Sequence, residues 1–277
     1  MLWLTSRHAI DLSRPRVMGI VNVTPDSFFD GGRHLASDAA RAHCDQLVRE
    51  GADLLDIGGE STRPGAHSPS LQQELDRVLP VLEHARQLGV PVSIDTSTPE
   101  LMRAALAAGA DIINDVRALR RPGALEAVAA HAGCGVCLMH MLGVEAAAMQ
   151  SAPSYGDVVH EVRSFLQARL QALEHAGVSA QRVVLDPGIG FGKTPEHNWA
   201  LMQRQHELLT LGRPLLVGWS RKSTLGALTG RDADHRLAAS LAAALAAVQR
   251  GARIVRVHDV AATVDALSVW QRSGLGA

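Results

Sequence analysis

Polar side chains stand where several short apolar runs of the chain end. Asp95, Asn114 and Asp186 each close such a run. A carboxylate can accept two parallel N–H donors with charge assistance, and an amide both accepts and donates. If these side chains converge, they would suit a flat heterocycle that carries adjacent N–H groups. Each acid alone could instead cap the N-terminus of a helix, as the segment 95–100 would allow. Helix capping does not explain why all three polar residues stand at such positions.

Basic side chains follow two later runs. Ser220-Arg-Lys-Ser223 comes after the seventh run, and Arg256 and His258 stand at the end of the eighth. These two residues are two positions apart, so in a strand both side chains lie on one face. Together with Arg63 and the basic pair at 221–222, they would form a positive patch where barrels often bind phosphate. The alternative, an exposed and solvated basic surface, suits Arg120-Arg121 better than these strand ends.

Two segments rich in Gly and Pro follow the first and second runs. They are Asn22–Gly32 and Gly58–Gly65. Loops that cover an active-site mouth have this composition, although surface turns share it. Asn22 adds a neutral oxygen ligand that suits a hydrated Mg²⁺, which keeps waters and shares its site with phosphate.

Two further patterns resemble known sites but lack what the chemistry requires. The segment 188–194 is not a phosphate-binding loop, because Pro187 stands where the first glycine should be. The second pattern consists of His131, Cys134, Cys137 and His140, spaced three apart as in a zinc site. The surrounding residues predict a strand, in which positions three apart point in opposite directions. We therefore expect the two cysteines to be small buried hydrophobes.

The elements that position these residues follow a regular rhythm. Eight apolar runs alternate with Ala/Leu-rich stretches of helical spacing; the runs are 17–22, 53–57, 92–95, 111–114, 135–139, 183–186, 215–218 and 254–257. Continuous apolar strands suit a parallel sheet covered by helices on both faces. About eight such repeats in about 250 residues predict an α/β fold, a (β/α)₈ TIM barrel, rather than a doubly wound sheet. No linker divides the chain, so we expect one domain over 1–277, with motifs from about 16 to 273 and the active site at the C-terminal ends of the strands.

Composition excludes several other classes of protein. The 277 residues carry 27 Lys+Arg against 28 Asp+Glu, and only 3% are aromatic, which argues against a nucleic-acid partner. Residues 1–17 lack a signal-peptide pattern, and the longest apolar stretch, 237–248, is too short to span a membrane. Three cysteines, an odd number, suit a reducing compartment. We expect a cytoplasmic protein with no membrane partner.

Taken together, seven segments resemble the dihydropteroate synthase family of pterin-binding barrels. They are Met18–Phe28, Asp56–Ala66, Ser93–Ser97, Ile113–Val116, Leu185–Lys193, Ser220–Ser223 and Arg256–Val260, in the family's order and with little insertion. One such segment alone would be only suggestive, whereas the ordered set is specific. Thr98 and Trp219 depart from the residues that are common in the family at those positions.

The resemblance implies a transferase of folate biosynthesis that works with Mg²⁺ as a homodimer. It would condense 6-hydroxymethyl-7,8-dihydropterin diphosphate with 4-aminobenzoate to give 7,8-dihydropteroate and diphosphate. Matched by position, the pterin-binding residues of the family correspond to Asp95, Asn114, Asp186 and Lys222, of which Asp95, Asp186 and Lys222 would be catalytic. The diphosphate ligands correspond to Asn22, Arg63, Arg256 and His258, and Asn22 would also lie near the metal. The residues around the aminobenzoate correspond to Thr62, Pro64, Phe191 and Ser223.

The expected chemistry agrees with these residue types. Breaking the C–O bond at the pterin methylene leaves a delocalised cation, which carboxylates around the ring would stabilise. A neutral arylamine needs no strong base, so we expect no covalent enzyme intermediate. A pterin-binding methyltransferase domain would share the Asp and Asn residues but would not need an Arg/Lys/His anion site. A non-catalytic paralogue is the second alternative, which an assay of diphosphate release would test.

Overall fold

Eight parallel strands form a nearly closed barrel in the computed structural model, which describes residues 1–23, 32–60, 69–143 and 153–275. The strands are β3 (Arg16–Asn22), β4 (Leu54–Gly58), β5 (Val92–Asp95), β6 (Ile112–Asp115), β7 (Gly135–Met139), β8 (Val183–Asp186), β9 (Leu216–Val217) and β10 (Ile254–Val257). Their hydrogen-bonded order is β8-β7-β6-β5-β4-β3-β10-β9, and a parallel bridge between Leu185 and Leu215 joins the two ends. The predicted (β/α)₈ barrel fold is confirmed.

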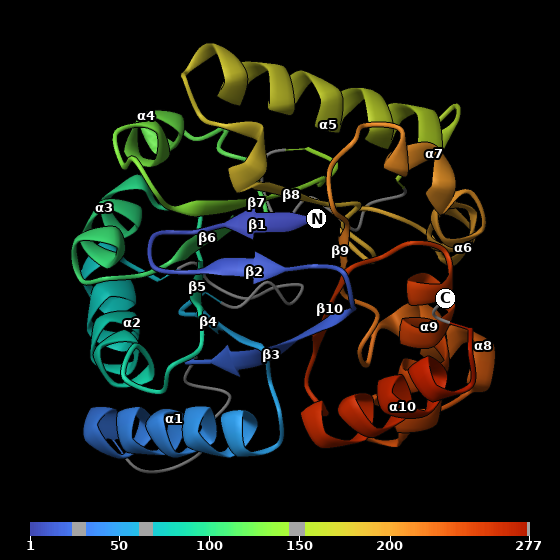
Figure 1. Ribbon diagram of the computed structural model, residues 1–277, viewed down its shortest axis with the longest axis horizontal. Coiled ribbons are helices and arrows are strands. Elements are labelled where there is room, and N and C mark those ends of the chain that lie inside the picture. Colours follow the sequence, from blue (N-terminus) through green and yellow to red (C-terminus); the bar gives the residue numbers. More distant parts are fainter. Residues whose placement is uncertain (24–31, 61–68, 144–152, 276–277) are drawn as a thin grey trace.

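Helices surround the barrel on its outer side (Figure 1). They are α1 (Gly32–Arg49), α2 (Leu71–Ala85), α3 (Pro99–Ala107), α4 (Ala124–Ala129), α5 (Val158–His175), α6 (Pro195–Gln203), α7 (Gln205–Leu209), α8 (Ser223–Thr229), α9 (Leu237–Gln249) and α10 (Val260–Arg272). The described residues also contain two 3₁₀ turns, η3 (Ala180–Arg182) and η4 (Ala233–His235). Within the described ranges, no helix has both the length and the apolar character that crossing a membrane requires.

Strand residues alternate between two cores, as the period of two requires. Val17, Leu55 and their equivalents pack outward against the helices. The inward-facing residues Met18, Leu54, Ile112, Cys137, Val184, Leu216 and Ile254 form a separate cluster inside the barrel. Two positions further along, four of these strands carry polar residues on the same face: Asp56, Asn114, Asp186 and Arg256. The barrel therefore has an apolar floor with a polar layer above it, toward the C-terminal ends of the strands.

A short hairpin that the sequence analysis did not predict packs against the apolar floor. Its strands are β1 (Leu2–Leu4) and β2 (Ala9–Asp11). Trp3 is fully buried among the inward-facing floor residues, and its Nε1 donates a hydrogen bond to the carbonyl of Arg182 at 2.8 Å. Arg7 then ties the hairpin to Asp111, just before β6, through a bidentate pair of 2.6 and 3.0 Å. The hairpin covers the N-terminal end of the barrel, so the opposite mouth is the face that can receive substrates.

Candidate active site

Four of the inward-facing polar residues are joined by hydrogen bonds across the barrel. Arg256 donates from Nε to Asp56 Oδ2 at 2.6 Å and from Nη2 to Asp95 Oδ2 at 3.0 Å. Asn114 donates from Nδ2 to the same Asp56 oxygen at 3.1 Å. Asp95 and Asn114 are register partners on β5 and β6, which explains their proximity. The structure therefore brings together Asp95, Asn114 and Arg256, as their strand-end positions predicted.

Asp95 does not act as a helix cap. The N-cap of α3 is Thr98, whose side chain makes no capping bond, whereas the Asp95 carboxylate pairs with Arg256. Burial raises the pKa of Asp95, and the Arg256 guanidinium opposes that rise. Because Arg256 already binds two carboxylates, a diphosphate would have to share its guanidinium with them, and its role toward diphosphate stays a prediction.

Asp186, Lys222 and Phe191 form a second group in the mouth. Asp186 Oδ1 accepts the Gly188 N–H at 2.7 Å. Burial raises the pKa of Asp186 to about 6, and the Gly188 N–H and the Lys222 charge oppose this rise. Lys222 Nζ lies 4.2 Å from the centre of the Phe191 ring, a favourable cation–π distance. Burial lowers the pKa of Lys222 to about 8, and the charge of Arg256 adds to the effect. A carboxylate and an ammonium thus face the mouth with pKa values moved toward neutrality.

The loop between β8 and α6 is held in place by a buried lysine that the sequence analysis did not assign. Lys193 Nζ donates to the carbonyls of Gly188 and Phe191 at 2.9 and 3.1 Å and to His140 Nδ1 at 2.9 Å. Burial lowers the pKa of Lys193 to about 7. The only sequence signal was that this lysine ends a Gly-x-Gly-x-Gly run that fails as a phosphate loop. Its contacts fix the segment that presents Phe191.

Gly188 is expected to tolerate no side chain. Its φ is +69°, and an added Cβ would overlap the carbonyl oxygen of His140. Gly212 has nearly the same φ, +68°, with nothing within 4 Å of the added Cβ, so it is a matched control for backbone strain alone. Both alanine variants should lose roughly 1–2 kcal/mol of unfolding free energy from the left-handed backbone. Gly188→Ala should lose clearly more free energy of unfolding than Gly212→Ala when both are measured by urea denaturation. Equal losses in the two variants would contradict the described packing of this loop.

His258 and Arg221 differ from the expected positive patch. Ser220 Oγ lies 2.9 Å from His258 Nδ1 and also accepts the His258 backbone N–H at 3.2 Å. Burial, together with the charges of Arg256 and Arg221, lowers the pKa of His258 to about 4, so its ring is neutral at pH 7. Arg221 is paired with Asp259 through bonds of 2.6 and 3.1 Å. The patch is thus largely compensated by carboxylates, and His258 can offer an anion an N–H donor but no charge.

The other predicted site residues either have a position in the fold but no described side-chain contact in the mouth, or lie outside the described ranges. Asn22 ends β3 as the register partner of Gly58, and Ser223 begins α8 directly after Lys222. Thr62, Arg63 and Pro64 lie outside the described residues. In the part of the chain that the structure describes, no three His, Cys, Asp or Glu side chains are grouped to hold a metal.

The two departures from the family pattern lie in structural positions. Trp219 is buried in the outer core and stacks on Trp199 of α6, with ring centres 5.2 Å apart. Thr98 precedes α3, and its Oγ1 accepts a hydrogen bond from Arg121 at 3.4 Å. The carbonyl of Trp219 also accepts the backbone N–H of Lys222 at 3.2 Å, so Trp219 supports the segment that carries this predicted pterin-site residue.

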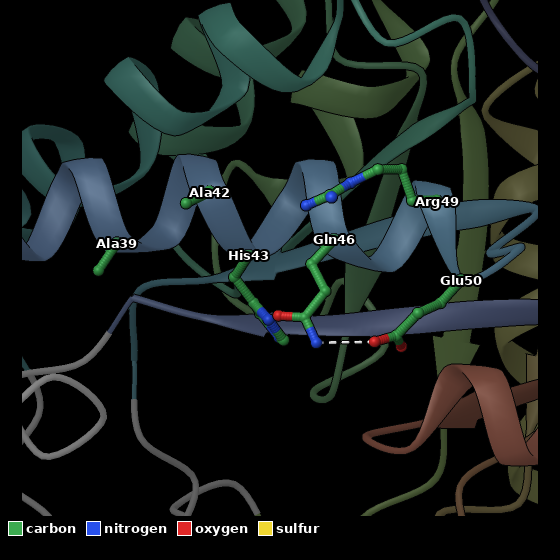
Figure 2. A pocket seen from close by; sticks show the side chains of 6 residues that line it. All are labelled: Ala39, Ala42, His43, Gln46, Arg49 and Glu50. Atoms are coloured by element: carbon green, nitrogen blue, oxygen red, sulfur yellow. Dashed lines mark hydrogen bonds between the residues drawn. The ribbon is translucent and has the colours of Figure 1, made fainter.

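A separate hollow lies on the outside of the barrel and offers no converging chemistry. Figure 2 shows its six lining residues, Ala39, Ala42, His43, Gln46, Arg49 and Glu50, all from α1 and the residue after it. Gln46 and Glu50 bond to each other at 2.7 Å, an ordinary pair one helical turn apart. This surface contains none of the residues of the mouth.

Acidic, amide and ammonium groups that meet at the C-terminal mouth of a barrel are typical of pterin-binding enzymes. Residues 18–258 match the family described as "Pterin binding enzyme", and the chain belongs to that family. It is 53% identical over 280 residues to the dihydropteroate synthase of Neisseria meningitidis serogroup B, covering 99% of this chain and 98% of the relative.

Solved structures agree with this assignment. The Xanthomonas albilineans dihydropteroate synthase with 4-aminobenzoic acid has a TM-score of 0.90 and 56% identity, covering 96% of this chain and 95% of that chain. The Burkholderia cenocepacia dihydropteroate synthase complexed with 7,8-dihydropteroate has a TM-score of 0.89 and 52% identity, covering 99% and 96%.

Proposed function

We infer that the protein catalyses the dihydropteroate synthase reaction, a transferase step of folate biosynthesis. In it, 6-hydroxymethyl-7,8-dihydropterin diphosphate and 4-aminobenzoate give 7,8-dihydropteroate and diphosphate. The observation that carries this proposal is the meeting of Asp95, Asn114, Asp186 and Lys222 at one barrel mouth in a chain whose close relatives are dihydropteroate synthases. A coupled assay of diphosphate release with the two substrates tests it. Absence of release would favour a non-catalytic pterin-binding protein.

The buried mouth residues are proposed to bind the pterin ring. Asp186 would accept two N–H donors of the ring on its carboxylate, and Asn114 would both accept and donate. Lys222 would donate to a ring acceptor while its Nζ stays over Phe191. Asp95, held by Arg256, would add negative charge beside the ring.

The proposed reaction breaks the C–O bond between the pterin methylene and diphosphate and forms a C–N bond to the arylamine. The carboxylates of Asp95 and Asp186 would stabilise positive charge as it develops on the ring. Arg256, the N–H of His258 and Arg63 would stabilise the departing diphosphate. The amine nitrogen then loses a proton to the surroundings. No side chain has to form a covalent bond with the substrate in this reaction.

Mg²⁺ is proposed to bind together with the diphosphate, with Asn22 as the protein ligand. The donor set fits, because Mg²⁺ keeps several waters and often takes only one or two protein oxygens beside phosphate. When bound, the metal would neutralise charge on the leaving group. Chelation followed by re-addition of Mg²⁺ tests this requirement.

The pH profile of the reaction should be bell-shaped. Asp186 must be ionised to accept hydrogen bonds, and Asp95, whose pKa burial raises to about 7, must be ionised to stabilise the developing positive charge. The kcat/KM for the pterin substrate should therefore fall as pH drops from about 7 through about 6. Lys222 must be protonated, so kcat/KM should fall again as pH rises through about 8. In Lys222→Arg the alkaline limb should disappear, because arginine does not titrate in this range. A flat profile from about pH 5 to 9 would contradict these roles.

The assembly and location are also proposals. We propose that the chain is one domain, since the strands from β3 to β10 belong to one ring. We propose a homodimer that uses the α8–α10 side, where Leu228, Leu237 and Val269 are exposed apolar residues; sedimentation equilibrium tests it. The three free, buried cysteines support a reducing, cytoplasmic location.

A further inference from the structure

Asp56 is a fully buried carboxylate in the middle of β4, between two residues predicted to bind substrate. Its Oδ2 accepts from Arg256 Nε at 2.6 Å and from Asn114 Nδ2 at 3.1 Å. No role follows for Asp56 from its place in the sequence motif, because an acid inside an apolar strand gives no hint of its partners. The geometry makes it the common anchor of both side chains.

This anchor determines how the Asn114 amide is turned. A carboxylate paired with a guanidinium only accepts hydrogen bonds, so Asn114 must direct its Nδ2 toward Asp56. Its Oδ1 is then the atom left to accept an N–H from a bound ring. On the other side, Asp56 and Asp95 hold two edges of the Arg256 guanidinium and so fix its plane.

The arrangement is costly for folding. Asp56 Oδ1 is buried and has no hydrogen-bond partner among the described residues, and the same holds for Ser93 Oγ at the paired position of β5. Buried polar atoms without partners destabilise the fold, and buried ion pairs often contribute little net stability. Stability therefore does not explain why an acid occupies this position, whereas substrate orientation does.

We propose that Asp56 is a positioning residue for pterin recognition, which acts by fixing the Asn114 amide and the Arg256 guanidinium. The proposal rests on the function inferred above. In Asp56→Leu, a side chain of similar shape, no acceptor remains for Arg256 Nε or Asn114 Nδ2, which both bind the same Asp56 oxygen. Asn114 is then free to turn its own nitrogen toward the ring. The KM for the dihydropterin diphosphate should rise about 10- to 100-fold, because one hydrogen bond becomes a repulsive donor pair. The KM for 4-aminobenzoate should change little.

Asp111→Leu is the matched control. Asp111 is also a fully buried carboxylate, but it lies at the opposite end of the barrel and binds Arg7 and the Val92 N–H. Its loss should lower the melting temperature and leave both KM values near wild type. If Asp56 were merely structural, Asp56→Leu would behave in the same way, and the proposal would be overturned.

The path of the effect is tested by a double-mutant cycle. In an Asn114→Ala background, adding Asp56→Leu should weaken pterin binding by much less than it does alone; fully additive losses would contradict action through Asn114. If Asp56→Leu does not fold, neutron diffraction of the wild-type protein with a bound pterin decides the matter. Asn114 Nδ2 should face Asp56, and a reversed amide or a direct Asp56–pterin bond would overturn the proposal. Inactive wild-type enzyme would instead refute the proposed function, so the two failures are distinct.

Discussion

Replacing Asp186 by asparagine should weaken pterin binding about 10- to 100-fold, because charge-assisted hydrogen bonds contribute roughly 1.5–3 kcal/mol. The structure adds a reason why the amide cannot adapt. The Gly188 N–H, 2.7 Å from Oδ1, would take the amide oxygen of the new side chain. Its NH₂ group would then face the N–H donors of the ring. Donor would meet donor, and the pocket would lose its main acceptor.

Isothermal titration calorimetry with a pterin ligand measures this loss directly. Urea denaturation should show that the variant remains folded. Burial raises the pKa of Asp186, which means that the fold disfavours its ionised form, so removing this charge should not destabilise the protein. Asp111→Asn, the same substitution at a buried carboxylate far from the mouth, provides the comparison, with lower stability and intact affinity. Unchanged pterin affinity in Asp186→Asn would remove Asp186 from the site.

Lys222→Arg should lower turnover at least tenfold although it keeps the positive charge. The lysine side chain passes close to Gly190, where an added Cβ would lie only 3.2 Å from Lys222 Cδ. Its Nζ is a compact charge over the Phe191 ring. A guanidinium is wider, planar and different in reach, so it would displace the Phe191 ring or leave the pterin acceptor unpaired.

Steady-state kinetics with each substrate varied in turn checks this expectation. Because Lys222 lies between Asp186 and Phe191, the KM values for the pterin and for 4-aminobenzoate should both rise. Lys193→Arg would not be a suitable control, since Lys193 supports the same loop. Arg213→Lys is preferable, because Arg213 lies outside the mouth and donates to the carbonyl of Ala180. Wild-type turnover by Lys222→Arg would show that its side chain is misplaced.

The barrel could be predicted because its strands are buried on both faces and therefore appear as continuous apolar runs. All eight predicted runs contain strands of the structure, β9 being the shortest at two residues. The β1–β2 hairpin escaped prediction because its strands have only three residues each and are recognisable mainly by what they cover. The stretch 195–208 has continuous helical spacing in the sequence, yet it forms two helices, α6 and α7, divided at Arg204, where no Gly or Pro marks the break.

The site could be located from the sequence, but its pairings could not. Strand ends in a parallel barrel meet at one mouth, and this rule alone placed Asp95, Asn114 and Asp186 together. The partners of Arg256 lie on the inward faces of other strands. One of them, Asp56, stands within an apolar run of the sequence, which gives no sign of its contact with Arg256. The neutral ring of His258 is likewise a result of burial, which charge counting along the chain does not reveal.

The most direct test of the account is to identify the product made by the purified protein. With 6-hydroxymethyl-7,8-dihydropterin diphosphate, 4-aminobenzoate and Mg²⁺, chromatography with mass detection should find 7,8-dihydropteroate. It should form in equal amount to the diphosphate released, and Asp186→Asn should form far less under the same conditions. Diphosphate release without 7,8-dihydropteroate, or neither product from a folded wild-type protein, would contradict the assignment of this mouth as a dihydropteroate synthase active site.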